Sequence, residues 1–139
     1  MKFQRQRSAW IAIVGSLAAG IVFAADPAAP APAAATLMSQ EALLEQQAKH
    51  ADSLFLLDVR TPQEFAEGHV PGAVNVPHDQ LASRLAGVPK DKDVVIYCRS
   101  GRRSALAADV LRANGYSRLS HLDGDMLAWI AQGRPVEKP

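Results

Sequence analysis

The sequence predicts an α/β domain, a small parallel sheet with helices on both faces. Two short apolar runs, LFLLDV at 54–59 and DVVIYC at 93–98, are typical of strands that are buried on both faces. Segments with helical spacing separate such runs along the chain, and strands that alternate with helices form parallel sheets covered on both sides. The chain has 139 residues, 48% of them hydrophobic, which suits one compact domain.

Residues 1–24 are interpreted as a cleaved signal peptide. The basic leader MKFQRQR precedes the apolar stretch SAWIAIVGSLAAGIVFA, and cleavage is expected after Ala24, with Ala25 as the alternative. Gln6 separates Arg5 from Arg7, so the leader has no twin-arginine pair, and general secretion to the periplasm is the expected route. A retained membrane anchor is disfavoured, because spanning a bilayer takes about 20 apolar residues. No cysteine lies near the cleavage site to carry a lipid, so no stable anchor is expected after cleavage.

An Ala/Pro-rich linker is predicted over 25–36, because this stretch has almost no large apolar side chains and its prolines keep it extended. The folded domain is expected over 37–139. Its first helix is predicted within 38–50 with Ser39 as N-cap, and a strand follows at 54–59. Thr61 and Glu64 have the spacing of a capping box with Pro62 at the first helical position, and this short helix is expected to stop at Gly68.

The second half repeats the alternation of strands and helices. GHVPGAVNVP predicts a turn and a short strand, and HDQLASRLAGV at 78–88 predicts a helix with Leu81 and Leu85 four residues apart. A strand at 93–98 and a helix at 104–115 follow, the helix ending on the C-cap pair Asn-Gly. YSRLSHL predicts a last strand. DGDMLAWIAQG predicts a last helix with Met126, Leu127 and Ile130 on its inner face.

The distribution of charge argues against nucleic acid as a partner. The whole chain carries a formal charge of +1. Without residues 1–24 it would hold twelve basic and fourteen acidic residues, a net charge of −2. The one tight basic cluster is Arg99, Arg102 and Arg103, and three charges suit a small anion better than a duplex backbone.

Cys98 is the only cysteine, so no intrachain disulfide can form, and the thiol is either an inert core residue or a nucleophile. It ends the clearest strand, where open α/β sheets bind ligands. The loop N–H groups, the start of the next helix and the three arginines would stabilise a thiolate, and Gly101 permits close approach. These features favour the nucleophile. The four histidines lack paired ligand spacing, so no metal site is expected.

Residues of about 54–133 resemble the single-domain rhodanese family of sulfurtransferases. The resemblance is carried by LLDVR with EF and GHVPGAVNVP, by VVIYCRSGRRSALAADVLRANGY, and by LDGDMLAW. It implies that Cys98 takes a sulfane sulfur from a donor such as thiosulfate and passes it to cyanide or a thiol. It further implies that the backbone of 99–103, including Ser100, holds the persulfide, that the loop arginines bind the donor, and that no cofactor is needed.

Two alternatives remain beside this interpretation. Related cysteine phosphatases and arsenate reductases have a loop one residue longer, with arginine six positions after the cysteine, whereas Ser104 stands there in this chain. A non-catalytic sulfur carrier or redox sensor is the other alternative.

Asp58 and Arg60 follow the first predicted strand, at the same sheet edge as Cys98, and are expected to form an ion pair that shapes the pocket.

One position departs from the family pattern. Asp125 stands where the family usually has a second glycine. It either caps the last helix or places negative charge at the mouth of the site, where it would weaken thiosulfate binding.

No apolar surface stripe is evident, and a monomer is expected.

Overall fold

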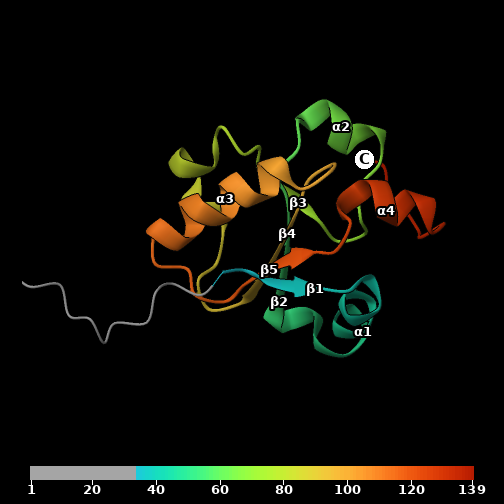
Figure 1. Ribbon diagram of the computed structural model, residues 1–139, viewed down its shortest axis with the longest axis horizontal. Helices are drawn as coiled ribbons and strands as arrows, with labels where there is room; N and C mark the ends of the chain where they lie inside the picture. The colour runs from blue at the N-terminus through green and yellow to red at the C-terminus, as the bar shows by residue number, and fades with distance from the viewer. Residues whose placement is uncertain (1–33) are drawn as a thin grey trace, which may run out of the picture.

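The computed structural model describes residues 34–139, so the predicted signal peptide and most of the predicted linker lie outside the described residues. Five strands form one sheet in the order β1-β5-β4-β2-β3, and every pair is parallel (Figure 1). This confirms the predicted α/β class. The strands are β1 (Thr36–Met38), β2 (Leu54–Asp58), β3 (Val74–Asn75), β4 (Asp93–Tyr97) and β5 (Leu119–Leu122).

Helices cover both faces of the sheet, as predicted. The α-helices are α1 (Gln40–His50), α2 (Pro62–Glu67), α3 (Arg102–Ala113) and α4 (Asp125–Ala131), and the 3₁₀ turns are η1 (Ala51–Ser53), η2 (Leu81–Ser83) and η3 (Leu85–Gly87). In Figure 1, α3 lies on one side of the sheet and α1 and α4 lie on the other. No helix within residues 34–139 has both the length and the apolar character needed to cross a membrane.

The core is divided by the sheet into two clusters, because successive strand residues point to opposite faces. Val94 and Ile96 of β4 belong to the cluster on the α3 side. Val95 and Tyr97 of the same strand belong to the cluster that holds Met126 and Trp129 of α4. The central strand is therefore buried on both faces, which explains its unbroken apolar sequence.

Two helix starts are capped as predicted. The Ser39 side chain accepts a hydrogen bond from the Ala42 N–H at 3.1 Å and caps α1. The Thr61 hydroxyl accepts from the Glu64 N–H while the Glu64 carboxylate accepts from the Thr61 N–H, which completes the capping box of α2. This box positions the start of α2 beside the carboxyl end of β2.

The helix predicted over 78–88 is wrong, since this segment forms the separate turns η2 and η3. The segment is short and ends at Pro89, which cannot continue a helix. The Ser83 hydroxyl also donates to the Gln80 carbonyl at 2.9 Å, a local contact that competes with helix formation. Leu81 is buried in these turns, so its core role does not require the helix.

The inner face predicted for α4 is only partly right. Met126 and Trp129 are buried, whereas Leu127 is 46% exposed and Ile130 is 58% exposed. The helix packs through residues three apart, and the positions that follow each of them turn towards solvent. These two exposed apolar residues border the pocket described below.

Differences from the sequence-based expectation include an additional strand and an earlier start of a helix. The sequence indicated no strand before the first helix, yet β1 pairs with β5 along Thr36–Met38. Helix α3 begins at Arg102, two residues before the predicted segment. The loop after Cys98 is therefore shorter than the sequence indicated.

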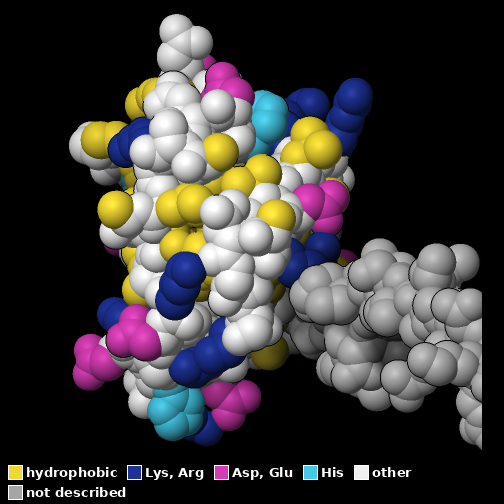
Figure 2. Space-filling view, turned by 90° about the vertical axis from the view of Figure 1, so that its left-hand side faces the viewer, with side chains coloured by type: hydrophobic (Ala, Val, Ile, Leu, Met, Phe, Trp, Pro, Cys, Tyr) yellow, Lys and Arg dark blue, Asp and Glu magenta, His cyan; other side chains and the backbone are white. Residues whose placement is uncertain are grey.

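Charges of both signs are interspersed on the face of the molecule shown in Figure 2, the side of α3. Hydrophobic side chains gather near the middle of this face, and no extended basic surface is visible on it. This pattern agrees with the charge balance of the sequence.

Candidate active site

The carboxyl ends of the parallel strands place three polar segments at one edge of the sheet. Asp58 ends β2, Cys98 directly follows β4, and the turn 123–124 connects β5 to α4. Asp58 pairs in register with Tyr97, which brings the end of β2 next to the cysteine loop. Ligands of open α/β sheets bind at this edge.

Cys98 lies at the floor of the loop that joins β4 to α3. It is 1% exposed, and its Sγ accepts a hydrogen bond from the Gly101 N–H at 3.0 Å. The Ser104 Oγ lies 3.5 Å from the sulfur on the inner side. Helix α4 holds the other side of the loop, where the Met126 N–H donates to the Cys98 carbonyl at 3.0 Å.

Gly101 makes this close approach possible. Its φ of 113° lies in the left-handed region that side chains other than glycine rarely adopt. A Cβ here would also lie 3.2 Å from the Asp125 Oδ2. A residue with a side chain would therefore be strained at this φ and crowded against Asp125.

The loop arginines differ in their surroundings. Arg99 and Arg102 are exposed, as is Ser100. Arg103 instead forms a two-point pair with Glu64, with Nη1–Oε2 at 2.6 Å and Nη2–Oε1 at 2.8 Å. The structure therefore leaves two loop cations in solvent and connects the third to α2.

The pairing with Arg103 has a strong effect on Glu64. The guanidinium hydrogen bond lowers the pKa of Glu64 from 4.5 to about 2, against the opposing effect of burial and with help from the Thr61 N–H and hydroxyl. Glu64 is thus ionised throughout the neutral range. The same carboxylate caps α2 and anchors the start of α3, so it couples the two helices that flank the loop.

Asp58 and Arg60 form a buried ion pair beside the loop. Arg60 Nη2 lies 2.6 Å from Asp58 Oδ2, and the same nitrogen donates to the Gly68 carbonyl at 2.8 Å. Burial opposes the charge of Arg60, but the hydrogen bond to Asp58 and the negative charges around the guanidinium together outweigh it and raise the pKa of Arg60. The pair connects β2 to the end of α2, and the Asn75 side chain donates to the carbonyls of both paired residues.

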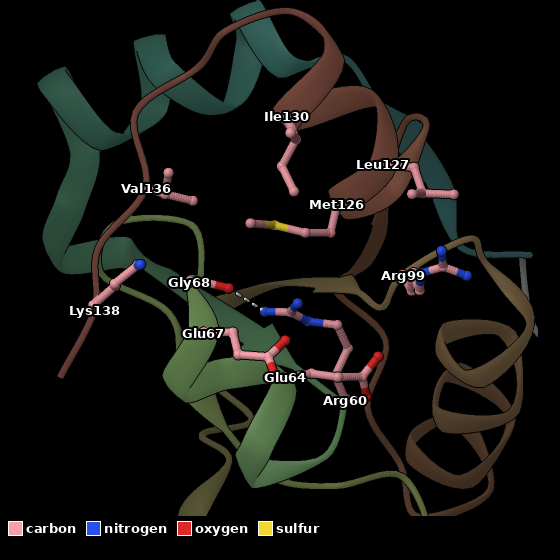
Figure 3. A pocket seen from close by; sticks show the side chains of 10 residues that line it. All are labelled: Arg60, Glu64, Glu67, Gly68, Arg99, Met126, Leu127, Ile130, Val136 and Lys138. Carbon is pink, nitrogen blue, oxygen red and sulfur yellow. Dashed lines mark hydrogen bonds between the residues drawn. The ribbon is translucent and has the colours of Figure 1, made fainter.

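A pocket of about 440 Å³ lies beside the cysteine loop. Figure 3 shows Met126 and Ile130 above it, Arg60 and Glu64 below it, and Arg99 at one end. The remaining lining comes from Glu67, Gly68, Leu127, Val136 and Lys138. One wall is therefore apolar and the other is charged.

Three polar residues lie behind Cys98, and the sequence indicated a role only for Asp125 among them, as a helix cap or as a charge at the mouth of the site. They are Ser104, His121 and Asp125, which hydrogen-bond to one another. Asp125 is buried and accepts the Cys98 N–H at 2.8 Å, so its carboxylate is turned away from the mouth of the site. Asp125 was visible in the sequence as a departure from the family pattern, but it does not cap α4, whose N-cap is Gly124. For His121 the only signal was its spacing of four residues from Asp125. No group of three or more possible metal ligands occurs within residues 34–139.

Comparisons with known proteins identify the family. The model of the rhodanese-like domain matches residues 39–132. A sulfurtransferase of Allochromatium vinosum is 42% identical over 96 residues, which cover 69% of this chain and 90% of that protein. The thiosulfate:glutathione sulfurtransferase of Saccharomyces cerevisiae is 34% identical, covering 61% of this chain and 70% of that protein.

Solved structures show the same architecture. A rhodanese-related protein from Thermoplasma volcanium aligns with a TM-score of 0.66 and 27% identity, over 75% of this chain and 99% of that one. The cysteine loop at the end of the central parallel strand thus lies within the part of the chain that the family model matches. The chain belongs to the rhodanese-like domain family.

Proposed function

We propose that the protein is a thiosulfate sulfurtransferase that carries sulfur as a persulfide on Cys98. Sulfur transfer in general is the activity that the family match and the sulfurtransferase relatives support. The observation that carries the proposal is the 3.0 Å hydrogen bond from the Gly101 N–H to the Cys98 sulfur, in a loop that also holds three arginines. A hydrogen-bond donor at this position stabilises an anionic sulfur.

The proposed reaction has two displacement steps. The Cys98 thiolate attacks the outer sulfur of thiosulfate, the S–S bond of thiosulfate breaks, and sulfite leaves with the bonding electrons. The enzyme then holds the persulfide anion within the loop. Attack of cyanide or a thiolate on the outer sulfur breaks the new S–S bond and returns the Cys98 thiolate. Neither step changes the number of electrons overall, so no cofactor is required.

The exposed cations Arg99 and Arg102 are the proposed docking groups for the donor anion. Arg103 is engaged by Glu64 and would add positive potential at the loop from that fixed position. Replacing Arg99 or Arg102 with Gln should raise KM for thiosulfate severalfold. The exposed Arg84, whose side chain bonds only to Gln80, serves as the matched control in an Arg84→Gln variant.

Mass spectrometry of the purified protein tests the persulfide. Addition of thiosulfate should add about 32 Da at Cys98, and a thiol or cyanide should remove it. A Cys98→Ser variant should show neither the adduct nor thiocyanate production. Stable sulfenic or mixed-disulfide forms of Cys98 would instead favour redox sensing, and absence of the adduct with every donor would reject the proposal.

The pocket beside the loop is the proposed site of the thiol acceptor. Its volume of about 440 Å³ exceeds the needs of a small inorganic anion. The exposed Leu127 and Ile130 offer apolar contact for the body of a thiol compound. Ile130→Ser should therefore raise KM for a peptide thiol while leaving KM for cyanide unchanged. Equal effects on both acceptors would contradict this assignment.

Export to the periplasm is also proposed, on the basis of the basic leader and apolar stretch in residues 1–24. Fractionation of expressing cells followed by mass analysis of the mature protein would test it. An N-terminus at Ala25 in the periplasmic fraction is the expected result. An uncleaved chain in the cytoplasmic or membrane fraction would contradict the proposal.

A further inference from the structure

A buried polar network connects helix α4 to the sulfur of Cys98. The Asp125 Oδ1 accepts from the Cys98 N–H at 2.8 Å and lies 3.3 Å from the Ser104 hydroxyl, whose single proton it shares with the Gly101 carbonyl at 2.9 Å. The His121 Nε2 lies 3.0 Å from the Asp125 Oδ2 and 3.0 Å from the Ser104 Oγ. Since the Ser104 Oγ contacts the sulfur, one hydroxyl separates Cys98 from an acidic and basic pair.

The geometry makes His121 and Asp125 a hydrogen-bonded pair of a base and an acid. The His121 Nε2 faces both carboxylate oxygens of Asp125, which requires a proton on that nitrogen. The hydrogen bond from Asp125 raises the pKa of His121. Burial favours a neutral Asp125, but the hydrogen bonds from His121, the Cys98 N–H and Ser104, together with the charge of His121, outweigh it and lower the pKa of Asp125. A carboxylate therefore lies beneath the cysteine, and the imidazole beside it is a cation when it is protonated.

The backbone conformation at Asp125 is unfavourable for any residue that has a side chain. Its φ of 53° makes it the only residue other than glycine with a positive φ within residues 34–139. A left-handed conformation costs a residue with a side chain on the order of 1 kcal/mol or more. This position suits glycine, and the hydrogen bonds of the carboxylate to Cys98 and Ser104 offset the strain.

We propose that Asp125 and His121 are positioning residues of the sulfur-transfer site that act as a charge-compensated pair. Asp125 orients the Cys98 peptide and the Ser104 hydroxyl, and His121 cancels the charge that Asp125 would otherwise place beneath the reacting sulfur. The inference rests on the proposed function, because it concerns the same cysteine.

The consequence is electrostatic. A lone Asp125 carboxylate would repel both the thiolate and the incoming anionic donor, and burial would strengthen this repulsion. The other charged groups that face the network are Asp123 near His121 and Arg103 near Cys98. Compensation by His121 therefore leaves the positive potential of the loop available to the donor.

A double-variant experiment tests the pair. His121→Gln keeps a donor towards Asp125 and removes the positive charge, and Asp125→Asn keeps the shape and removes the negative charge. The rates of Cys98 alkylation by the anion iodoacetate and by neutral iodoacetamide are compared at about pH 6, below the ordinary histidine pKa of 6.5, in both variants and in the double variant. His50→Gln, on the exposed end of α1, is the matched control.

Charge compensation predicts a distinct pattern. His121→Gln should lower the ratio of iodoacetate to iodoacetamide rates by roughly tenfold, since a nearby like charge disfavours an anion by about this factor. The double variant should recover most of the ratio. The inference is overturned if the double variant is no better than His121→Gln, or if His121→Gln leaves the ratio unchanged in a protein that unfolds at the wild-type temperature.

The proposed function is tested separately by loading the same variants with thiosulfate. His121→Gln should slow persulfide formation by a similar factor, with recovery in the double variant. If the wild-type protein forms no persulfide with any donor, the proposed function fails, while the alkylation ratios still decide whether the pair sets the charge around Cys98.

Discussion

Removal of Arg60 should destabilise the domain severely, because it leaves the carboxylate of Asp58 buried without a cation. The Asp58 side chain is fully buried, and its carboxylate accepts three hydrogen bonds from the Arg60 guanidinium. In Arg60→Met, that carboxylate would retain the Arg60 backbone N–H at 2.9 Å, and the Gly68 carbonyl would lose its donor. Breaking a buried pair on one side costs about 3–5 kcal/mol.

Urea unfolding followed by circular dichroism measures this loss. For a domain of this size, a loss of 3–5 kcal/mol corresponds to a drop in Tm of roughly 15–30 °C. The double variant Asp58→Asn with Arg60→Met should recover most of the free energy of unfolding, because no buried charge remains. Arg118→Met, which breaks the exposed pair with Asp93, is the matched control and should change little.

Two results would refute this reasoning. If Arg60→Met and Arg118→Met shift the unfolding midpoint equally, burial does not govern the strength of the pair. If the double variant is no more stable than Arg60→Met, the loss comes from missing packing of the arginine stem rather than from an uncompensated charge.

Three further predictions concern the elements around the loop. Gly124→Ala should cost roughly 2–4 kcal/mol in urea unfolding, because φ is 73° and a Cβ would lie 2.3 Å from the Ala128 Cβ; an unchanged midpoint would contradict this. The folded-state pKa of Glu64 is depressed, so its pair with Arg103 stabilises fully above pH 4.5 and is lost as the pH falls towards about 2. Glu64→Gln should flatten that part of the acid unfolding curve, and a curve parallel to wild type would be the contrary result. The pKa of His121 is raised, so its pairing with Asp125 stabilises fully below pH 6.5, and this stabilisation is lost as the pH rises through the raised value. The free energies of unfolding of wild type and His121→Gln, measured in urea at several pH values, should therefore converge at alkaline pH. A difference that stays constant with pH would oppose the assignment.

Local signals predicted the elements that depend on neighbouring residues. The capping box at Thr61, the N-cap at Ser39 and the buried strand before Cys98 are decided by interactions within a few residues. The helix expected around Leu81 and Leu85 failed for the opposite reason, because two leucines four residues apart are compatible with any compact turn that faces the core.

The exposed side of α4 could not be read from its sequence. Met126, Leu127 and Ile130 are all apolar, and only the way in which the helix packs on the sheet decides which of them meets solvent. The short strand β1 was missed because its three residues gain their structure from pairing with β5, far along the chain.

The sequence by itself determined the family pattern, the position of Cys98 at the end of a strand, and the run of arginines that follows it. Tertiary structure decided which polar groups surround the sulfur. Ser104, His121 and Asp125 come from separate elements and meet only because β4 and β5 are adjacent and parallel. The same folding turned the carboxylate of Asp125 inward to the Cys98 peptide, since a buried acid is stable only where donors and a cation converge on it.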